Sequence, residues 1–240
     1  MRYFILQSSL NQKVVGNIPQ VKEVIHNCHV WDDPKFIERF PFKKIEKDPI
    51  LSNAILYVKA KQTDLIEVGS VGFSLGSMVI SNKFKKLLEQ FNCFGLQFFS
   101  THIIHKNKKV NDYWQTHIYD IPYDFIDFQN TDFLLKDRDE NNKPFQNYLE
   151  RMDKKGFLDM AVSMKYPKML FLKNVSFNNE MNIDYFFLRN FEGNGYGIIS
   201  EKLKKEIEKQ ELEGMEFRPF ELTLQEWLHS GERDKIYERI

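Results

Sequence analysis

Three side chains of metal-binding type stand close together in the segment HNCH. His26, Cys28 and His29 are all ligands that zinc accepts, so this trio could begin a metal centre. A tetrahedral site needs further ligands at a matching spacing, and the sequence offers no second cluster and no CxxC pair. His102 and His105 lie three positions apart, and alternation along a strand would point them to opposite faces. We therefore predict no bound metal.

A glycine-rich segment, EGNGYGIIS at residues 192–200, is similar to a phosphate-binding loop that precedes the N-terminus of a helix. It lacks the GK[ST] ending of a P-loop and has no acidic residue at the distance that a dinucleotide-binding fold requires. A turn is the simpler interpretation. Cys28 has histidines near it only in sequence, which does not establish a catalytic triad. We predict no catalytic residue and no cofactor.

Two enzymatic alternatives stay open at this stage. A metal-dependent hydrolase would use His26, Cys28 and His29, whereas a nucleotide-binding protein would use the loop at 193–197. Stoichiometric zinc in the purified protein that is lost on His29→Ala would favour the hydrolase.

Acidic and aromatic residues are mixed in DYWQTHIYDIPYDFIDFQNTDF at residues 112–133. Such a mixture is typical of a surface that meets a basic protein, because aromatic rings give contact area and carboxylates pair with lysine or arginine. The alternative is a solvated strand pair whose phenylalanines face the core. On the first interpretation the candidate partner-binding residues are Asp120, Tyr123, Asp124, Asp127 and Asp132.

The composition limits the class of protein. Lys+Arg and Asp+Glu number 34 each, so the zero net charge gives no overall attraction to nucleic acid or to an anionic membrane. The 42% hydrophobic content, with 22 Phe and 10 Tyr, indicates a folded core. No apolar run approaches the roughly 20 residues of a membrane helix, and the first ten residues lack the apolar stretch of an export signal. We predict a cytoplasmic protein with reduced cysteines that binds neither nucleic acid nor membrane.

The hydrophobic pattern predicts the elements that must position these residues. Strands are expected at 2–7, 53–61, 113–119, 168–175 and 184–191, with a short helix near 35–39. Thr223 is expected to cap another short helix, closed by Gly231. The polar stretch at 135–147 is expected to be a surface loop. The result is an α+β fold over a single domain, 1–240, with a mixed, largely antiparallel sheet and helices packed on one face.

An internal repeat is the most informative pattern. ISNKFKKLLEQFNCFGLQFF at 80–99 aligns without gaps on ISEKLKKEIEKQELEGMEFR at 199–218, with eight of twenty positions identical. Each copy predicts a helix capped by a serine, then a glycine turn, then a strand. The serines are Ser81 and Ser200, and the glycines are Gly95 and Gly214. The helix-turn-strand units are expected near 78–104 and 197–222.

The two repeat helices differ in their apolar stripes. Phe84, Leu87, Leu88 and Phe91 of the first copy correspond to Leu203, Glu206, Ile207 and Gln210 of the second. A half-polar stripe predicts a shallower and more exposed helix, so Glu206 and Gln210 join the candidate partner-binding residues. The same face could instead let the chain associate with itself as a scaffold, which light scattering of Ile207→Lys would test.

Three segments carry a loose motif: an N-terminal RYF.L strand, a central YW...I...D.IDF stretch and a late IIS..LK...E.....G.EF.P segment. Its residues are Tyr3, Phe4, Tyr113, Asp127, Phe128, Ile199, Ser200, Leu203, Gly214, Phe217 and Pro219. This pattern resembles bacterial immunity proteins of polymorphic toxin systems, in particular immunity protein family eleven, formerly a domain of unknown function. The resemblance covers nearly the whole chain and departs mildly at Thr131, where serine is expected.

The resemblance implies a small cytosolic protein made beside a secreted toxin, such as one used in interbacterial competition through type VI secretion. The protein would bind its toxin and cover the active site or substrate groove, so that the producing cell and its kin survive. The implied partner is the toxin, and no catalysis is implied.

Overall fold

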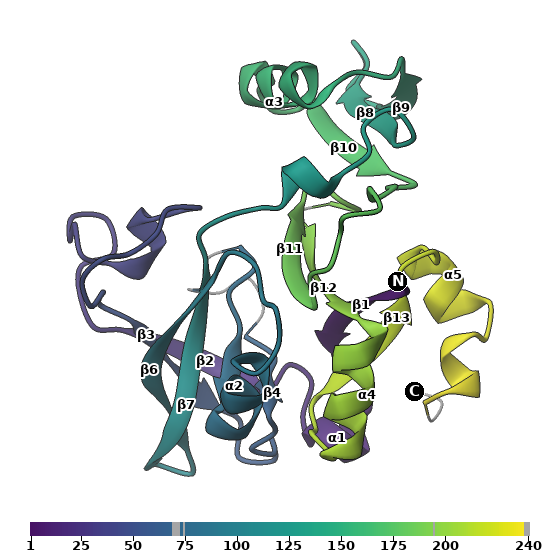
Figure 1. Ribbon diagram of the computed structural model, residues 1–240. Helices are drawn as coiled ribbons and strands as arrows, with labels where there is room; N and C mark the ends of the chain where they lie inside the picture. The colour runs from purple at the N-terminus through teal and green to yellow at the C-terminus, as the bar shows by residue number, and fades with distance from the viewer. Residues whose placement is uncertain (69–72, 74, 194, 238–240) are drawn as a thin grey trace. The chain divides into compact units, whose positions relative to one another are not determined.

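The structure is a computed structural model that describes residues 1–68, 73, 75–193 and 195–237 (Figure 1). The chain divides into two compact units. The large unit comprises Met1–Ile121, Ile183–Phe187 and Tyr196–Ile240, and the small unit comprises Pro122–Asn182 and Leu188–Gly195. That the two units act as one domain stays a prediction.

The elements follow one another through both units. The strands are β1 (Tyr3–Ser8), β2 (Val21–His26), β3 (Ser52–Leu56), β4 (Leu65–Ile66), β5 (Val79–Ser81), β6 (Leu96–His105), β7 (Lys108–Ile118), β8 (Asp132–Arg138), β9 (Pro144–Leu149), β10 (Met169–Lys173), β11 (Tyr185–Arg189), β12 (Gly195–Ser200) and β13 (Met215–Pro219). The helices are α1 (Gln12–Val15), α2 (Asn82–Leu88), α3 (Lys154–Ser163), α4 (Glu201–Lys209) and α5 (Leu224–His229), with 3-10 turns η1 (Ile37–Arg39), η2 (Tyr123–Phe125) and η3 (Arg233–Lys235). Each predicted strand overlaps one of these strands, although the one expected at 53–61 ends at Leu56.

The mixed α and β structure with mostly antiparallel sheets confirms the predicted fold class. The described strands form three sheets rather than the one expected. Six strands pair in the order β2-β3-β6-β7-β5-β4, four in the order β11-β12-β1-β13, and three in the order β10-β8-β9. β3 and β6 run parallel, whereas β1 is antiparallel to both of its described partners, β12 and β13.

The two repeated segments have the same order of elements around a central antiparallel strand. In the first, β5, α2 and β6 follow in sequence, and β7 lies between the two strands. In the second, β12, α4 and β13 follow in sequence, and β1 lies between them. The next strand outward is β4 beside β5 and β11 beside β12. The strand orders β4-β5-β7-β6 and β11-β12-β1-β13 therefore correspond.

The strand registers of the two segments also agree. The central strand is β7 in the first segment and β1 in the second. On each of these strands, the residue opposite the capping serine lies three positions before the residue opposite the repeated phenylalanine. The four pairs are Ser81–Tyr113, Phe98–Thr116, Ser200–Tyr3 and Phe217–Leu6. This correspondence supports the repeat read from the sequence, and its origin by duplication stays a prediction.

Local signals explain where the repeat helices begin and end. The hydroxyl oxygens of Ser81 and Ser200 each accept a backbone N–H three residues on, at 3.1 Å, as N-cap residues do. Gly214 has a φ of +97°, and a Cβ there would lie 2.3 Å from the carbonyl oxygen of Leu65, so only glycine fits. Thr223 caps α5 as predicted, with Glu226 completing a capping box.

Both repeat helices pack into one buried core of the large unit. Phe84, Leu87 and Leu88 from α2 share this core with Leu203 and Ile207 from α4. The two apolar side chains of α4 are fully buried, so the expectation of a shallow second helix is wrong for that half of the stripe.

The segment 135–147, expected to be a loop, is a β-hairpin, and this prediction was wrong. β8 and β9 pair antiparallel, with Leu135 opposite Asn147 and Arg138 opposite Pro144. Asp139 closes the turn, because its Oδ1 accepts the backbone N–H of Lys143 at 2.8 Å. The stretch is polar because most of β9 is exposed to solvent, and low hydrophobicity concealed the strand pairing.

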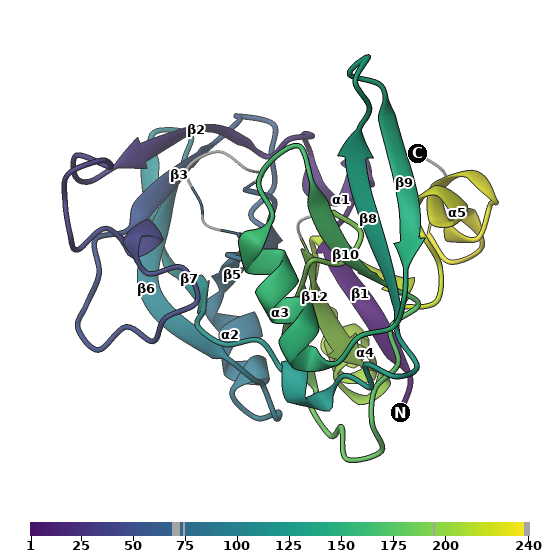
Figure 2. The ribbon, with the colours of Figure 1, turned by 90° about the horizontal axis from the view of Figure 1, so that it is seen from above.

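Helix α3, which the sequence analysis did not predict, covers one face of the small unit's sheet (Figure 2). Asp153 caps it, accepting the N–H of Gly156 at 2.7 Å. Phe157 is fully buried and packs on Phe128 and Phe133, with ring centroids 5.7 and 5.8 Å away. These rings form the interior of the small unit.

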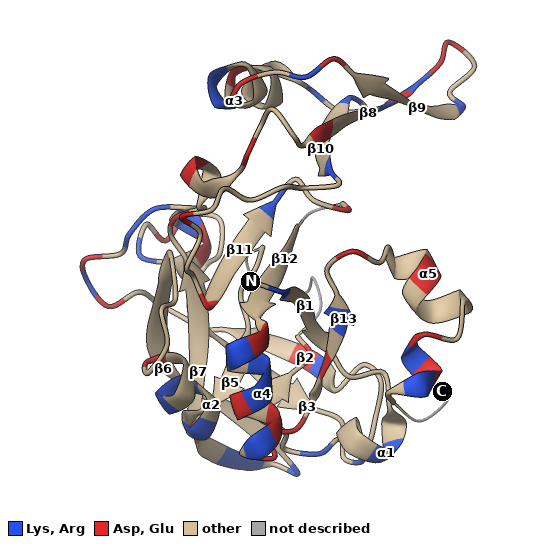
Figure 3. Ribbon diagram, turned by 45° about the vertical axis from the view of Figure 1, so that its right-hand side comes forward, with Lys and Arg blue, Asp and Glu red and all other residues tan. Residues whose placement is uncertain are grey.

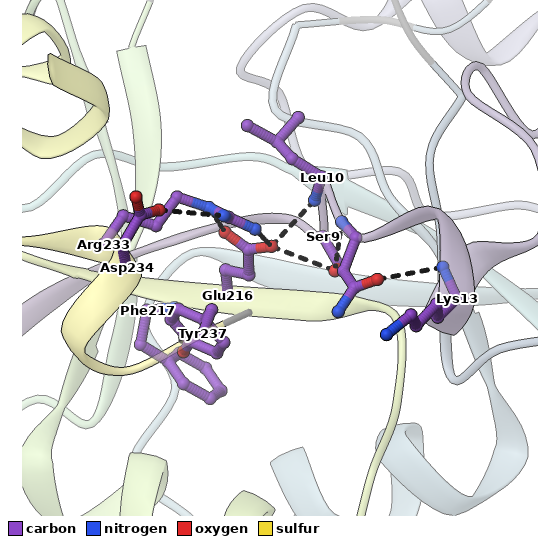
Figure 4. A network of polar contacts seen from close by, with 9 residues as sticks. Ser9, Leu10, Lys13, Glu216, Phe217, Arg233, Asp234 and Tyr237 are labelled. Atoms are coloured by element: carbon purple, nitrogen blue, oxygen red, sulfur yellow. Dashed lines mark hydrogen bonds and ion pairs between the residues drawn. The ribbon is translucent and has the colours of Figure 1, made fainter. Parts of the chain in front are cut away.

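A buried ion pair holds the C-terminal segment to β13 (Figure 4). Arg233 donates to both carboxylate oxygens of Glu216, at 2.6 and 2.7 Å, and both side chains are about 1% exposed or less. The hydroxyl of Ser9 and the backbone N–H of Leu10 also donate to Glu216, at 3.0 and 2.8 Å. This arrangement satisfies a carboxylate that would otherwise be costly to bury. None of the described helices is long and apolar enough to span a membrane.

Candidate interaction surface

Asp127, one of the candidate partner-binding residues, uses its carboxylate within its own turn. Oδ1 accepts the backbone N–H groups of Gln129 and Asn130 at 3.1 and 3.3 Å, and Oδ2 accepts the side-chain amide of Asn130 at 2.7 Å. The hydrogen bond from the Asn130 amide lowers the pKa of Asp127. Thr131 Oγ1 donates to the Asp127 carbonyl at 2.8 Å. The residue therefore shapes the turn that leads into β8.

Tyr123, Asp124 and Asp132 also make contacts within the small unit. The ring of Tyr123 packs on Phe157 at 5.9 Å between centroids, and burial raises the pKa of its hydroxyl to about 12. Asp132 Oδ2 accepts the side-chain amide of Asn174 at 2.9 Å. Asp124 is exposed and pairs with Lys154 at 2.5 Å. Phe128 and Phe133 of this stretch are buried, whereas Tyr123 and Phe125 are partly exposed, and the choice between a partner surface and a solvated strand pair stays a prediction.

Asp120, Glu206 and Gln210 belong to the large unit. Asp120 is exposed, and its Oδ1 accepts the backbone N–H of Ile121 at 2.8 Å. On α4 the side-chain amide of Gln210 donates to Glu206 at 3.0 Å, and this bond lowers the pKa of Glu206. Lysines and glutamates follow one another along this helix (Figure 3). The predicted partner-binding residues thus divide between the two units.

The histidines among the candidate metal ligands each have a hydrogen-bond partner of their own. Four histidines are hydrogen-bonded, whereas Cys28 packs beside a small buried cluster. The partners are Ser52 for His26, Asp32 for His29, Asn53 for His102 and Gln62 for His105. In the part of the chain that the structure describes, no three His, Cys, Asp or Glu side chains gather closely enough to hold a metal ion.

The glycine segment at 192–200 leads into a strand and not directly into a helix. β12 begins at Gly195 and includes Gly195 and Gly197, so these two glycines lie within the strand that precedes α4. Asn194, within the predicted loop, lies outside the described residues. The first turn of α4 is already capped by Ser200. The nucleotide-binding alternative therefore gains no support from the position of α4.

The small unit exposes four large apolar side chains around β9 and the start of β10. Phe145 and Tyr148 belong to β9, Met169 begins β10, and Tyr166 shortly precedes it. Their exposed fractions are 39%, 64%, 41% and 78% respectively. Together with Lys136 we call these residues the hairpin surface. A surface of this composition is unusual away from an interface, where large apolar side chains occur singly.

The strand register explains how the hairpin surface is arranged. Tyr148 lies opposite Leu134, and Met169 lies opposite Lys136, two residues farther along β8. Tyr148 and Met169 therefore share one face of the sheet, whereas Phe145, three residues before Tyr148, points to the other face. The apolar surface accordingly wraps around the edge strand.

A cavity of about 560 Å³ opens at the end of this hairpin. Phe145, Tyr166 and Met169 supply apolar lining, and the charged lining residues are Lys136, Arg138 and Asp137. The ammonium group of Lys136 also lies 4.9 Å from the ring centroid of Phe171. Aromatic rings, methionine and arginine are the residue types enriched at the centres of protein interfaces.

β9 is the outermost strand in the order β10-β8-β9, and its sequence PFQNYL carries no charge. Edge strands are commonly protected from pairing by charged side chains, and here only Pro144 at the first position has that effect. The sequence analysis missed this surface because it placed Phe145 in a loop. The residues Phe145, Tyr148 and Leu149, whose types favour strands or a buried sheet face, were the available signal.

The sequence matches the model of a known protein family. The sequence model described as the immunity protein family (Imm11) matches residues 5–222, nearly the whole chain and parts of both units. No curated protein matches the chain. Several motif residues of the late segment, among them Ile199, Ser200 and Leu203, build β12 and the start of α4, so they are explained by the fold of the large unit.

Proposed function

The chain belongs to the Imm11 immunity protein family, and from this membership we propose that it binds a cognate secreted toxin and neutralises it. The match over residues 5–222 is the observation that carries the proposal. Binding alone accomplishes neutralisation if the bound protein covers the toxin's active site or substrate groove. The family therefore supports a role without catalysis, carried out in the cytoplasm of the producing cell.

The hairpin surface is the part of the chain that we propose for toxin contact. Tyr148 and Tyr166 are large, rigid and exposed, so their burial against a partner would stabilise a complex. The uncharged edge of β9 could also add a strand of the partner to the small unit's sheet, since an edge strand presents backbone N–H and C=O groups outward. Apolar contact and strand pairing would act at the same place.

The candidate acidic residues would contribute less to toxin contact than the hairpin surface does. Asp120 is exposed and could pair with a basic toxin surface, whereas Asp124, although exposed, already pairs with Lys154. Asp127 and Asp132 are less suitable, because their carboxylates already hold Asn130 and Asn174.

Co-expression with the toxin encoded beside this chain tests the function. Cells that make the toxin should survive only when this protein is present, and the purified pair should form a complex. Each of the changes Tyr148→Ala and Tyr166→Ala should weaken the complex by about 2 kcal/mol, about 30-fold in Kd, and the double variant by about 4 kcal/mol, roughly 1000-fold. The thermal unfolding of the double variant should match that of the wild type, because both rings are exposed.

Val162→Ala gives the matched control. Val162 is 86% exposed on α3 in the same unit, but it lies outside the hairpin surface. This variant should protect as well as the wild type. A toxin that kills although the wild-type protein is present and folded would overturn the proposed function. Equal protection by the wild type and the double tyrosine variant would overturn only the assignment of the surface.

A further inference from the structure

A second cavity, of about 700 Å³, opens in the large unit beside the end of β3 and the β6–β7 hairpin. Its lining includes Lys22, Lys59 and Lys106, together with Tyr57 and Val58, and it contains no aspartate or glutamate. We call this group of five residues the basic pocket. It shares no residue with the hairpin surface, which belongs to the small unit.

The three lysines of the basic pocket come from separate parts of the chain. Lys22 lies on β2, Lys59 follows β3, and Lys106 lies in the turn between β6 and β7. All three are exposed, and none forms an ion pair with a described residue. Ammonium groups around one concavity repel one another, and the repulsion is relieved when an anion binds among them. The pocket is therefore suited to a negatively charged ligand.

The turn that carries Lys106 does not favour a lysine. Lys106 and Asn107 have φ values of 52° and 59°, and His105 pairs with Lys108 across them, which is the geometry of a two-residue type I′ turn. Asn, Asp and Gly are the residues that such a turn prefers at both central positions. A long cationic side chain at the first position is thus unfavourable for the backbone, which indicates a role for its charge.

The apolar lining narrows the choice of ligand. Val58 is 69% exposed and Tyr57 38% exposed, directly before Lys59 in sequence. A ligand segment with both carboxylates and an apolar side chain would fit this pocket. Its carboxylates would pair with the lysines, and its apolar side chain would pack on Val58 and Tyr57. The pocket has no arginine fork, and the zero net charge of the chain gives no broad attraction to a nucleic acid. A protein segment fits these features better than a nucleic acid does.

We propose that the basic pocket binds an acidic, partly apolar segment of a partner protein. The inference rests on the proposed function, under which that partner is the toxin. The pocket would add electrostatic attraction in the large unit to the apolar contact proposed for the small unit.

Neutralising the pocket tests this inference. Lys22→Gln, Lys59→Gln and Lys106→Asn together remove three charges, and Lys106→Asn introduces a residue that the turn prefers. The control triple variant Lys44→Gln, Lys47→Gln and Lys86→Gln removes the same charge from exposed lysines elsewhere in the large unit. Affinity for the purified toxin should be measured for both variants at low and high salt, together with thermal unfolding.

The pocket variant should bind about 30-fold more weakly than the control, equal to about 2 kcal/mol, and its affinity should depend less on salt. Lys106→Asn alone should unfold at the same or a higher temperature than the wild type while binding the toxin more weakly. Equal affinities for the two triple variants would overturn the inference and leave the proposed function standing.

Two further experimental outcomes would also overturn the inference about the basic pocket. If the wild-type protein does not bind the toxin, the inference and the proposed function both fail. If duplex DNA binds the wild type as tightly as the toxin does, and the pocket variant loses that binding, the ligand is a nucleic acid and the assignment to an acidic protein segment is wrong.

Discussion

Asp64 and Asp184 make the same set of hydrogen bonds at the starts of two different helices. Asp64 Oδ1 accepts the hydroxyl of Ser81 at 2.5 Å, and Asp184 Oδ1 accepts the hydroxyl of Ser200 at 2.6 Å. The backbone carbonyl of each aspartate also accepts the N–H of the same serine, at 2.8 and 2.9 Å. The serines cap α2 and α4, so each aspartate fixes one helix start.

The second carboxylate oxygen of each aspartate reaches the other repeat. Asp64 Oδ2 accepts the N–H of Glu213 at 2.9 Å, in the turn after α4. Asp184 Oδ2 accepts the N–H of Asn92 at 3.1 Å, in the turn after α2. Each aspartate therefore links the start of one repeat helix to the end of the other, and the two links are reciprocal.

Removing either carboxylate should destabilise the large unit. Asp184→Ala leaves the Ser200 hydroxyl and the Asn92 N–H without their acceptor, and Asp184 is only 5% exposed, so we expect a loss of about 3 kcal/mol. Asp64→Ala should cost less, because Asp64 is more exposed. Urea unfolding measures both, with Asp48→Ala, an exposed aspartate of the same unit, as the control. A change below 0.5 kcal/mol for Asp184→Ala, on the scale of an ordinary surface substitution, would contradict the proposed link.

The Glu216–Arg233 pair should behave as a coupled unit. Arg233→Met leaves a buried carboxylate with only the Ser9 and Leu10 donors, and we expect a loss of about 3–5 kcal/mol of stability. The double variant Glu216→Gln with Arg233→Met removes both charges and should be more stable than Arg233→Met alone. Urea midpoints for the two single variants and the double variant give the coupling energy. Strictly additive losses would show that the two charges do not stabilise each other.

Acid should destabilise the protein partly through His117. Burial lowers the pKa of His117 from its ordinary value of 6.5, and its Nε2 donates to the Lys43 carbonyl at 2.8 Å. The unfolded chain therefore binds a proton at a pH where the folded chain does not. This contribution to stability is complete above about pH 6.5 and declines as the pH falls from there towards the folded-state pKa. His117→Gln, measured by urea unfolding from pH 8 to 5, should show a smaller decline than the wild type, and an identical decline would reject this assignment.

Alanine should affect two glycines of positive φ very differently. Gly214→Ala places a Cβ 2.3 Å from the Leu65 carbonyl oxygen, so backbone must shift and we expect a loss above about 3 kcal/mol. Gly231 also has a positive φ, +79°, but a Cβ there meets no atom within 4 Å. Gly231→Ala should cost only the conformational strain, about 1 kcal/mol. Thermal unfolding of the two variants compares steric overlap with strain alone, and equal losses would exclude the overlap.

Short-range features were predictable from the sequence. The caps Ser81, Ser200 and Thr223 act on backbone groups within three residues, so residue type and spacing suffice to identify them. The Asp127 turn belongs to the same class, because its carboxylate holds Asn130 three positions on. The sequence analysis assigned Asp127 to a partner surface because it weighed the acidic composition of the segment above its turn chemistry.

The hairpin surface depended on tertiary structure. A polar segment reads as a loop until a partner strand is placed beside it, because strand pairing comes from backbone groups that every residue carries. The exposure of Tyr148 and the burial of Phe133, both aromatic residues in the same hairpin, follow from which face α3 covers. No pattern in the sequence of this segment predicts which face of the hairpin α3 covers.

The sequence by itself determined the mixed α and β class, the helix caps and glycine turns, and the resemblance to an immunity protein family, and it predicted the repeat. Tertiary structure alone decided how the strands divide among three sheets and which charges meet. Ser81 lies 17 residues from Asp64, Arg233 lies 17 from Glu216, and Glu213 lies 149 from Asp64. Contacts at such separations depend on how the chain folds back, and residue spacing along the sequence carries no record of that path.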